Sequence, residues 1–432
     1  MNVHFSSRST HVAGFLANPF AAYAAGFLIA MAVYSLGYSD LYPPLQPSLV
    51  AFLLATCAIA ICLAFAVGPF EDGRRREHES VPFHLTVFLI LTILFAAECA
   101  YSGGVPLLAA ATGGDSDYQT FGIPTLNVAF IGFSLFYSIY WFDLYLLRYG
   151  RIFLALSLLA ASTSVLIVHR GGLIITFVAA VFVYLQRRGL ERKLMISFTA
   201  IIVAMLWGFG LLGDLRTHGL TGESLILDIG KASDKFLDSD IPTEFFWPYL
   251  YISSPLSNLQ LNVSDRVADD KPALYMALEL LPDFVSKRLV PEDAMPATLP
   301  LRVTEQLTVS TMYGRAFLLM GWLGICLSFM YFIVIALVCM SLLRGSKYFI
   351  ATSSVLSSLG FLNIFDNMYL SAGGITLVLA ALTLHLFERP AGDDGGPSPR
   401  VELGRSGSEV LAYPPPDSAA SMRREARPDQ ID

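Results

Sequence analysis

Long apolar runs separated by short polar segments are the dominant pattern of this 432-residue chain. A helix needs about 20 predominantly apolar residues to cross the hydrocarbon core of a bilayer. Ten runs come close to that length, and they occupy residues 20–38, 48–68, 82–100, 124–147, 152–168, 171–186, 194–213, 314–342, 348–365 and 370–387. The fifth and sixth runs are short, and a tilted or re-entrant pair there would lower the count by two. The pattern predicts an all-α fold, a polytopic membrane bundle of about ten transmembrane helices.

These runs divide the chain into five regions. We expect an N-terminus at 1–19, a bundle of seven spans at 20–213, a large external loop at 214–312, a bundle of three spans at 313–388 and a tail at 389–432. The tail is rich in Gly, Pro, Ser and Arg and poor in apolar residues, a composition typical of disorder.

The large loop contains its own structural signals. Leu274, Leu278, Leu281 and Val285 recur at helical spacing, which predicts one amphipathic helix over 271–289. The aromatic segment from Phe245 to Tyr251 predicts a position at the membrane interface, where amphipathic rings are favoured.

The distribution of Lys and Arg predicts the orientation of the spans. Cytoplasmic loops of membrane proteins carry an excess of positive charge. With the N-terminus inside, the short inner segments carry 12 Lys and Arg and the short outer loops carry one, Arg170. We therefore expect both termini in the cytoplasm, the large loop outside, and a multi-pass protein of the cell inner membrane.

Composition excludes several classes of protein. Hydrophobic residues make up 55% of the chain and charged residues 15%, with a net charge of −7. That net charge argues against a nucleic-acid partner. Phosphate-loop, dinucleotide-binding and HExxH motifs are missing from the sequence. The five cysteines all lie in apolar runs without metal-ligand spacing, so they are interpreted as small core residues.

Arg170 is the sharpest candidate for chemistry. It lies in the segment His169-Arg170-Gly171-Gly172 between two short apolar runs. An arginine near membrane depth costs about 2.5–3.5 kcal/mol, and a guanidinium can grip a phosphate in two places. Gly172 and its neighbour would let a substrate approach the backbone. Glu98, near the outer end of the third run, is either a catalytic base or the ion-pair partner of Arg170.

Arg216 and His218 follow the seventh run, on the same side of the membrane as Arg170. Two arginines and a histidine at one water interface could bind a pyrophosphate and move a proton. The competing interpretation is an ordinary solvated loop.

Six further residues could contact sugar hydroxyls or rings from the outer side. They are Asp40, Trp247, Asn258, Tyr313, Arg315 and Asp366. For each of them, an interface anchor, a turn residue or a helix cap is an equally good interpretation. Asp143, near the inner end of the fourth run, is expected to pair with a nearby arginine.

Two DxD sequences, Asp115-Ser116-Asp117 and Asp238-Ser239-Asp240, match a signature of metal-dependent sugar transferases. Two acids one residue apart arise often by chance, and both copies are predicted to be external, where nucleotide sugars are absent. We therefore assign no metal.

Several stretches together resemble the Wzy-type polymerases of bacterial surface polysaccharides, the oligosaccharide repeat unit polymerases. They are Asn18-Pro19-Phe20, Tyr34-Ser35-Leu36-Gly37-Tyr38-Ser39, Gly103-Gly104-Val105-Pro106-Leu107-Leu108 with Tyr118 and Phe121-Gly122-Ile123-Pro124, the Arg170 hairpin, Trp247-Pro248-Tyr249-Leu250-Tyr251-Ile252 with Ser254-Pro255-Leu256, and Tyr313-Gly314-Arg315 with Gly321-Trp322-Leu323-Gly324. The layout matches over roughly 20–390, and the long polar tail departs from the family.

The resemblance implies a glycosyltransferase at the periplasmic face of the inner membrane. Such enzymes join repeat units carried on undecaprenyl pyrophosphate into O-antigen, capsule or exopolysaccharide. The family's external arginines map onto Arg170 and Arg216, with His218 or Glu98 taking the acceptor proton and Arg315 as a weaker phosphate contact. No cofactor is expected. Partners would be the lipid-linked oligosaccharide, the bilayer, a flippase and a chain-length regulator.

Two alternatives remain open from the sequence. An O-antigen ligase would use the same lipid donor on the same face with similar arginines. A transporter of lipid or polysaccharide would need no chemistry, but transporters usually show internal repeats and broken helices. The sequence indicates neither feature.

Overall fold

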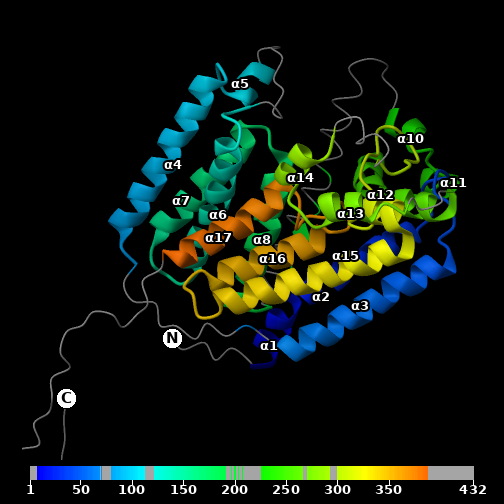
Figure 1. Cartoon of the computed structure of the whole chain (residues 1–432), viewed down its shortest axis with the longest axis horizontal. Helices are drawn as coiled ribbons and strands as arrows, with labels where there is room; N and C mark the ends of the chain where they lie inside the picture. Colours follow the sequence, from blue (N-terminus) through cyan, green and yellow to red (C-terminus); the bar gives the residue numbers. More distant parts are fainter. Residues whose placement is uncertain are drawn as a thin grey trace, which may run out of the picture. The chain divides into compact units, whose positions relative to one another are not determined.

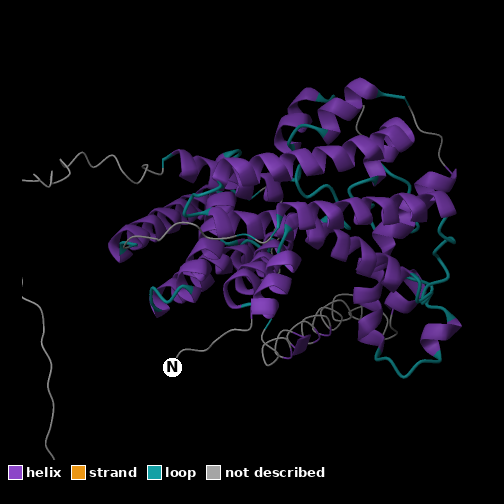
Figure 2. Cartoon of the chain, turned by 90° about the horizontal axis from the view of Figure 1, so that it is seen from below, coloured by secondary structure: helices purple, strands orange, loops and turns teal. Residues whose placement is uncertain are grey.

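The computed structural model describes residues 7–68, 70, 79–111, 121–190, 225–265, 270–291 and 299–387, with five single positions between 196 and 207. The described residues all belong to one compact unit, Met1–Glu388, and the tail that we expected to be disordered lies outside them. Every regular element in these ranges is a helix (Figures 1 and 2), so the all-α class is confirmed there.

Five helices are long and apolar enough to cross a membrane: α3 (Pro47–Val67), α4 (Val81–Tyr101), α6 (Leu126–Leu146), α8 (Arg170–Arg188) and α15 (Gly314–Leu343). Four shorter apolar helices accompany them: α2 (Pro19–Tyr34), α7 (Arg151–Leu166), α16 (Phe349–Leu362) and α17 (Ala372–Leu386). All nine lie at runs predicted from the sequence. The run 194–213 falls almost entirely outside the described residues, so the count of ten spans stays a prediction.

Helix α16 forms the centre of the bundle and packs against α2, α6, α8, α15 and α17. Its surface is rich in small residues, which let neighbouring backbones approach closely. Gly360 lies against the Pro19 carbonyl, where an added Cβ would approach the oxygen to 2.8 Å. The hydroxyls of Ser357 and Ser358 donate to the carbonyls of Ala17 and Ile175, on neighbouring segments. Because these hydroxyls find partners, a buried membrane helix can carry them at little cost.

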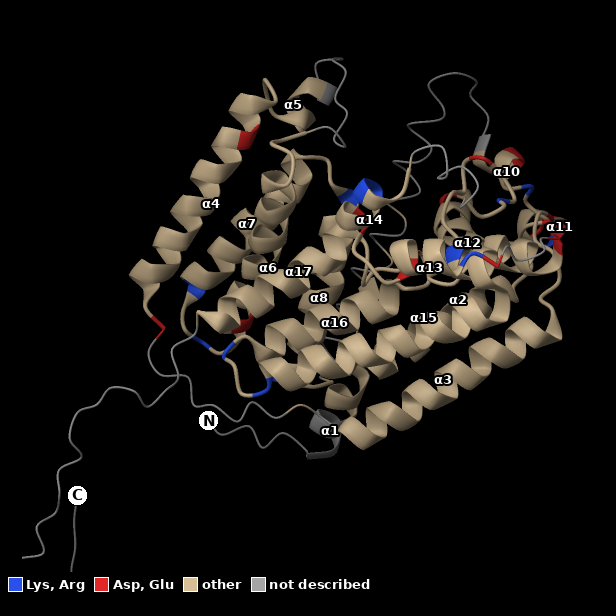
Figure 3. Ribbon diagram, viewed as in Figure 1, with Lys and Arg blue, Asp and Glu red and all other residues tan. Residues whose placement is uncertain are grey.

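Charged residues of the described chain gather at the ends of the helices (Figure 3). We call the end where α4 finishes and α6, α8, α15 and α17 begin the loop-side end, because the predicted loop joins there. At the opposite end Arg187 pairs with Asp143, as predicted for that aspartate. Glu79 there accepts hydrogen bonds from His84 and Tyr140. The two ends therefore carry separate polar networks.

The predicted large loop is helical through most of its described length. It contains α10 (Leu225–Ile229), α11 (Asp234–Leu237), the short 3₁₀ turn Thr243–Phe245, α12 (Phe246–Asp265), α13 (Pro272–Glu279) and α14 (Asp283–Leu289). Two short helices lie outside this loop, α1 (Ser7–Leu16) and α5 (Pro106–Ala111). The single amphipathic helix predicted over 271–289 is wrong, because the chain breaks between α13 and α14. Pro282 disfavours a helical conformation at the residue before it, and the amide of Asp283 donates to the Leu370 carbonyl instead.

The aromatic segment packs partly inside the protein, and its position at the membrane interface stays a prediction. Phe246, Tyr249 and Leu250 are buried in a small core with Ile226 and Phe236. Trp247 is half-buried, and Tyr251 is 39% exposed. Helix α12 thus turns one aromatic face inward, because its own loop helices α10 and α11 supply an apolar partner.

Candidate functional site

Arg315 and Glu279 form an ion pair at the loop-side end. Arg315 lies in the first turn of α15, and its Nε donates to Glu279 Oε1 at 2.6 Å. The guanidinium also donates to the Leu278 carbonyl at 3.2 Å. Glu279, the last residue of α13, has a side chain only 1% exposed. A buried carboxylate requires such a partner, because taking an unpaired charge out of water is costly.

Three polar residues surround this pair. Asp283 Oδ1 is 4.0 Å from an Arg315 nitrogen, and the Asn367 amide donates to Glu279 Oε2 at 3.4 Å. Asp366 is exposed beside them and raises the pKa of both other acids. Burial is the larger cause: it raises the pKa of Glu279 and that of Asp283, and the Arg315 charge only partly opposes it. We call Arg315, Glu279, Asp283, Asp366 and Asn367 the acid cluster.

A break in α15 holds α13 in place. Met320 and Gly321 have non-helical backbone angles, and Gly321 has a φ of 57°. The Leu319 carbonyl at the break accepts from the Lys271 amide at 3.0 Å. Tyr275 of α13 donates to the Gly324 carbonyl just beyond it, also at 3.0 Å. The absence of broken helices that we expected from the sequence is therefore wrong, since a left-handed glycine interrupts the longest one.

Arg170 opens α8 at the same end of the bundle and is exposed. In the described part of the chain it has no ion-pair partner, so its charge is open to a ligand. The hairpin before it is tight: Val168 has a φ of 63°, a left-handed conformation that is strained for a β-branched residue. Next to it, His169 Nδ1 is buried without a hydrogen-bond partner among the described residues, and burial lowers the pKa of this imidazole.

The Gly172 position differs from our expectation. An added Cβ there would meet His169 and Leu135 at 2.6 and 2.8 Å. This glycine therefore lets α8 pack on α6 and offers no room for a substrate. Gly171 remains open, with His169 as its nearest neighbour at 3.8 Å.

Glu98 is fully buried at the end of α4 and does not pair with Arg170. Its Oε2 accepts from the Ile123 amide, while Oε1 is buried without a hydrogen-bond partner in the described chain. Gly122, with a φ of 88°, leaves the space that this carboxylate occupies. The side chain thus fastens the turn that precedes α6, and the predicted ion pair is wrong.

Two predicted sugar contacts are packing residues. Tyr313 is completely buried, and its hydroxyl bonds to that of Tyr23. Asn258 is also completely buried; its amide donates to the Leu307 and Val309 carbonyls and its oxygen accepts from the Val303 amide. Because neither reaches a surface, their assignment to substrate binding is corrected. Asn258 instead satisfies the backbone of an irregular segment.

The remaining predicted residues are spread over the molecule. Asp40 is exposed in the turn after α2, where its amide donates to the Lys231 carbonyl, and Trp247 belongs to the aromatic core near α10 and α11. Asp366 lies in the acid cluster. Arg216, His218 and the first DxD copy lie outside the described residues. Within the described chain, no three His, Cys, Asp or Glu side chains converge as a metal site would require.

Sequence reasoning missed Glu279 and Asp283. Their spacing puts them on the polar face of the predicted amphipathic helix, so they look like ordinary solvated loop acids. A possible signal was the apolar flank of Glu279, which lies between Leu278 and Leu280-Leu281.

No family model, curated protein or solved structure matches this chain. The resemblance to repeat unit polymerases stays a prediction, and its site residues must be judged by geometry. The structure places two polar features at the same end of the bundle: the acid cluster around Arg315, and Arg170, which has no ion-pair partner among the described residues. Such a set can bind an anion and accept a proton from a hydroxyl.

Proposed function

We propose that this chain is a membrane glycosyltransferase that polymerises oligosaccharide repeat units carried on undecaprenyl pyrophosphate into a surface polysaccharide. The observation that carries the proposal is the ion pair of Arg315 with the buried Glu279 beside the partly exposed Asp283, at the end of the bundle where Arg170 has no ion-pair partner among the described residues. Lipid pyrophosphate is a good leaving group, so the reaction needs a base and fixed cations rather than a covalent intermediate.

In this mechanism the acceptor hydroxyl attacks the anomeric carbon of the donor glycan. The bond from that carbon to the pyrophosphate oxygen breaks, and its electron pair stays on the departing lipid pyrophosphate. Asp283, whose side chain is 31% exposed, takes the hydroxyl proton, because burial raises the pKa of its carboxyl and makes it a stronger base. Arg315 positions that carboxylate. Arg170, and Arg216 beyond the described residues, stabilise the charge that develops on the phosphate.

A reconstitution experiment tests the reaction. Purified protein in liposomes, given lipid-linked repeat units, should release undecaprenyl pyrophosphate and produce a ladder of chain lengths. Asp283→Asn should abolish the ladder while Arg302→Gln, at an exposed arginine of the same loop, should preserve it. Transfer only to a lipid A core acceptor would favour the ligase, and movement of the intact lipid across the bilayer without release of pyrophosphate would favour a transporter.

The proposal also requires the loop-side end to face the periplasm. Leu237, 54% exposed on α11, and Arg151, exposed at the opposite end, offer a matched pair of labelling sites. In a cysteine-free background, Leu237→Cys should react with a membrane-impermeant maleimide in intact spheroplasts, and Arg151→Cys only after lysis. The reverse pattern would remove the external site and with it this function.

The break in α15 raises one other candidate, the transporter. Discontinuous helices often form substrate sites in transporters because their broken backbone can bind ions. In the reconstitution experiment this candidate predicts lipid movement with the glycan bond intact.

A further inference from the structure

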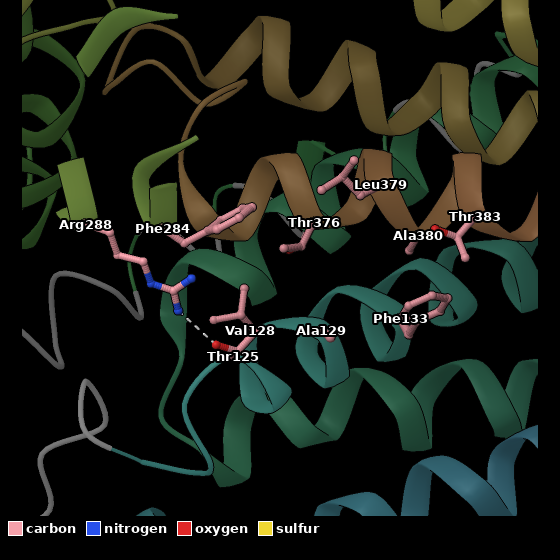
Figure 4. Close-up of a pocket in the computed structure, with 10 residues that line it drawn as sticks. All are labelled: Thr125, Val128, Ala129, Phe133, Phe284, Arg288, Thr376, Leu379, Ala380 and Thr383. Atoms are coloured by element: carbon pink, nitrogen blue, oxygen red, sulfur yellow. Dashed lines mark hydrogen bonds between the residues drawn. The ribbon is translucent and has the colours of Figure 1, made fainter. Parts of the chain in front are cut away.

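A cavity of about 220 Å³ lies between α6 and α17, with α14 at its loop-side mouth (Figure 4). Most of its lining is apolar and includes Val128, Phe133, Phe284 and Leu379. On α6 it extends from Thr125 to Phe133, a rise of about 12 Å at about 1.5 Å per residue. Both helices begin at the loop-side end, so the cavity runs from that end toward the membrane interior. We call it the α6–α17 slot.

Arg288 is the cation at the mouth of the slot. Its guanidinium donates to Thr125 Oγ1 at 3.1 Å, and Figure 4 shows both side chains at the same end of the lining. This partner is neutral, and no carboxylate pairs with Arg288 among the residues that the structure describes. Thr125 has a φ of 75°, which is strained for a β-branched residue, and its hydroxyl does not cap α6. The Thr125 hydroxyl therefore accepts a hydrogen bond from Arg288 and makes none to the first turn of α6.

The shape and chemistry of the slot select its occupant. An apolar channel between two membrane helices with a positive charge at the water end fits an amphiphile with an anionic head and an apolar chain. The slot is narrow because α6 and α17 touch beside it: a Cβ on Gly132 would lie 2.7 Å from the Thr376 Cβ. A single chain fits this width better than the paired acyl chains of a phospholipid.

We infer that the α6–α17 slot binds the isoprenoid chain of a polyprenyl pyrophosphate next to its head group, and that Arg288 binds the phosphate. The identity of this lipid rests on the proposed function. Helix α14 carries both Arg288, at the slot, and Asp283, in the acid cluster. Occupation of the slot would therefore bring the leaving pyrophosphate to the helix that borders Glu279.

Direct binding of sugar-free undecaprenyl pyrophosphate to the full chain in detergent tests this site without needing catalysis. Arg288→Gln should weaken binding at least tenfold, and so should Ala129→Trp, which fills the slot from an exposed position on its wall. Lys287→Gln removes the adjacent exposed cation and should leave affinity unchanged. Each variant is first compared with the parent protein in melting temperature.

The outcomes separate this inference from the proposed function. Unchanged binding in both Arg288→Gln and Ala129→Trp, at normal melting temperature, would overturn the slot even if polymerisation is observed. Competition by phosphatidylglycerol as strong as that by undecaprenyl phosphate would also overturn it, because the site would then be a phospholipid site. Weakened binding in both variants without any polymerisation would support the slot and reject the proposed reaction.

Discussion

Replacing Arg315 by methionine removes the cation that holds the Glu279 carboxylate, whose side chain is 1% exposed. Breaking a buried ion pair on one side typically costs about 3–5 kcal/mol, because the remaining charge stays buried without compensation. The Glu279 carboxylate can lower this cost by taking up a proton and becoming neutral. From an ordinary pKa of 4.5, protonation at pH 7 costs about 3.4 kcal/mol at about 1.36 kcal/mol per unit. We therefore expect a loss of about 3 kcal/mol in the free energy of unfolding at pH 7.

Because Glu279 protonates in the variant, the variant's free energy of unfolding depends on pH. In Arg315→Met the folded protein holds a proton on Glu279 that the unfolded chain releases at neutral pH. The variant's stability therefore falls as pH rises and recovers as pH drops toward the unfolded pKa of Glu279. Between pH 7 and pH 5 the difference from the parent protein should shrink by at most about 2.7 kcal/mol, two units at about 1.36 kcal/mol each, because the raised pKa of Glu279 gives the parent part of the same pH dependence.

Reversible unfolding in mixed micelles, titrated with a denaturing detergent at pH 7 and pH 5, measures this difference. Arg302→Met is the matched control, since Arg302 is exposed in the same loop and its loss should cost less than about 0.5 kcal/mol. The double variant with Glu279→Gln should recover most of the loss. A loss below about 1 kcal/mol, or one that does not change with pH, would refute the reasoning, because Glu279 would then not depend on Arg315.

Three further predictions concern other parts of the molecule. Asn258→Ala removes the hydrogen-bond partner of a buried backbone group at Leu307 and of partly buried ones at Val303 and Val309, and it should cost at least about 2 kcal/mol in unfolding free energy, measured by the same titration. Val168→Gly relieves a left-handed β-branched residue and should raise stability by about 1 kcal/mol; an unchanged or lower melting temperature would contradict this. Burial raises the pKa of Glu79, but hydrogen bonding to His84 and the Lys347 charge outweigh it and lower that pKa to about 2. The stability that the Glu79 carboxylate contributes is therefore present above about pH 4.5 and is lost as pH falls toward 2, and Glu79→Gln should remove this acid sensitivity in a melting series.

The positions of the membrane helices could be predicted from the sequence because burial in a bilayer has a single simple signature. Each of the nine described apolar helices lies at a predicted run, and the pairing of Asp143 with an arginine also followed from its depth. Hydropathy carries no information about what a polar residue contacts. Asn258 and Tyr313 therefore looked like surface groups although both are fully buried.

The candidate site was harder to predict because its ion pair joins residues far apart in the chain. Arg315 was found as a cation at the start of a span, but its partner Glu279 lies on a separate loop helix. The sequence predicts a phosphate contact for Arg170, Arg216 and, more weakly, Arg315, and it does not single out Arg288. The structure divides them: Arg315 is held by acids, while Arg170 and Arg288 have no carboxylate partner within the described ranges.

The break in α15 bears on the choice between enzyme and transporter. In transporters, a broken helix serves the substrate because its freed carbonyls and amides face a cavity. Here the protein itself occupies the break: the Leu319 carbonyl accepts from the Lys271 amide, and the Gly324 carbonyl accepts from Tyr275. These backbone oxygens are therefore not free to bind an ion. The break instead fastens α13 to the start of α15. One of these contacts, that of Tyr275, lies four residues before Glu279. A fixed Glu279 holds Arg315 beside Asp283, which is of use to an enzyme that needs a positioned base, whereas alternating access requires parts that move.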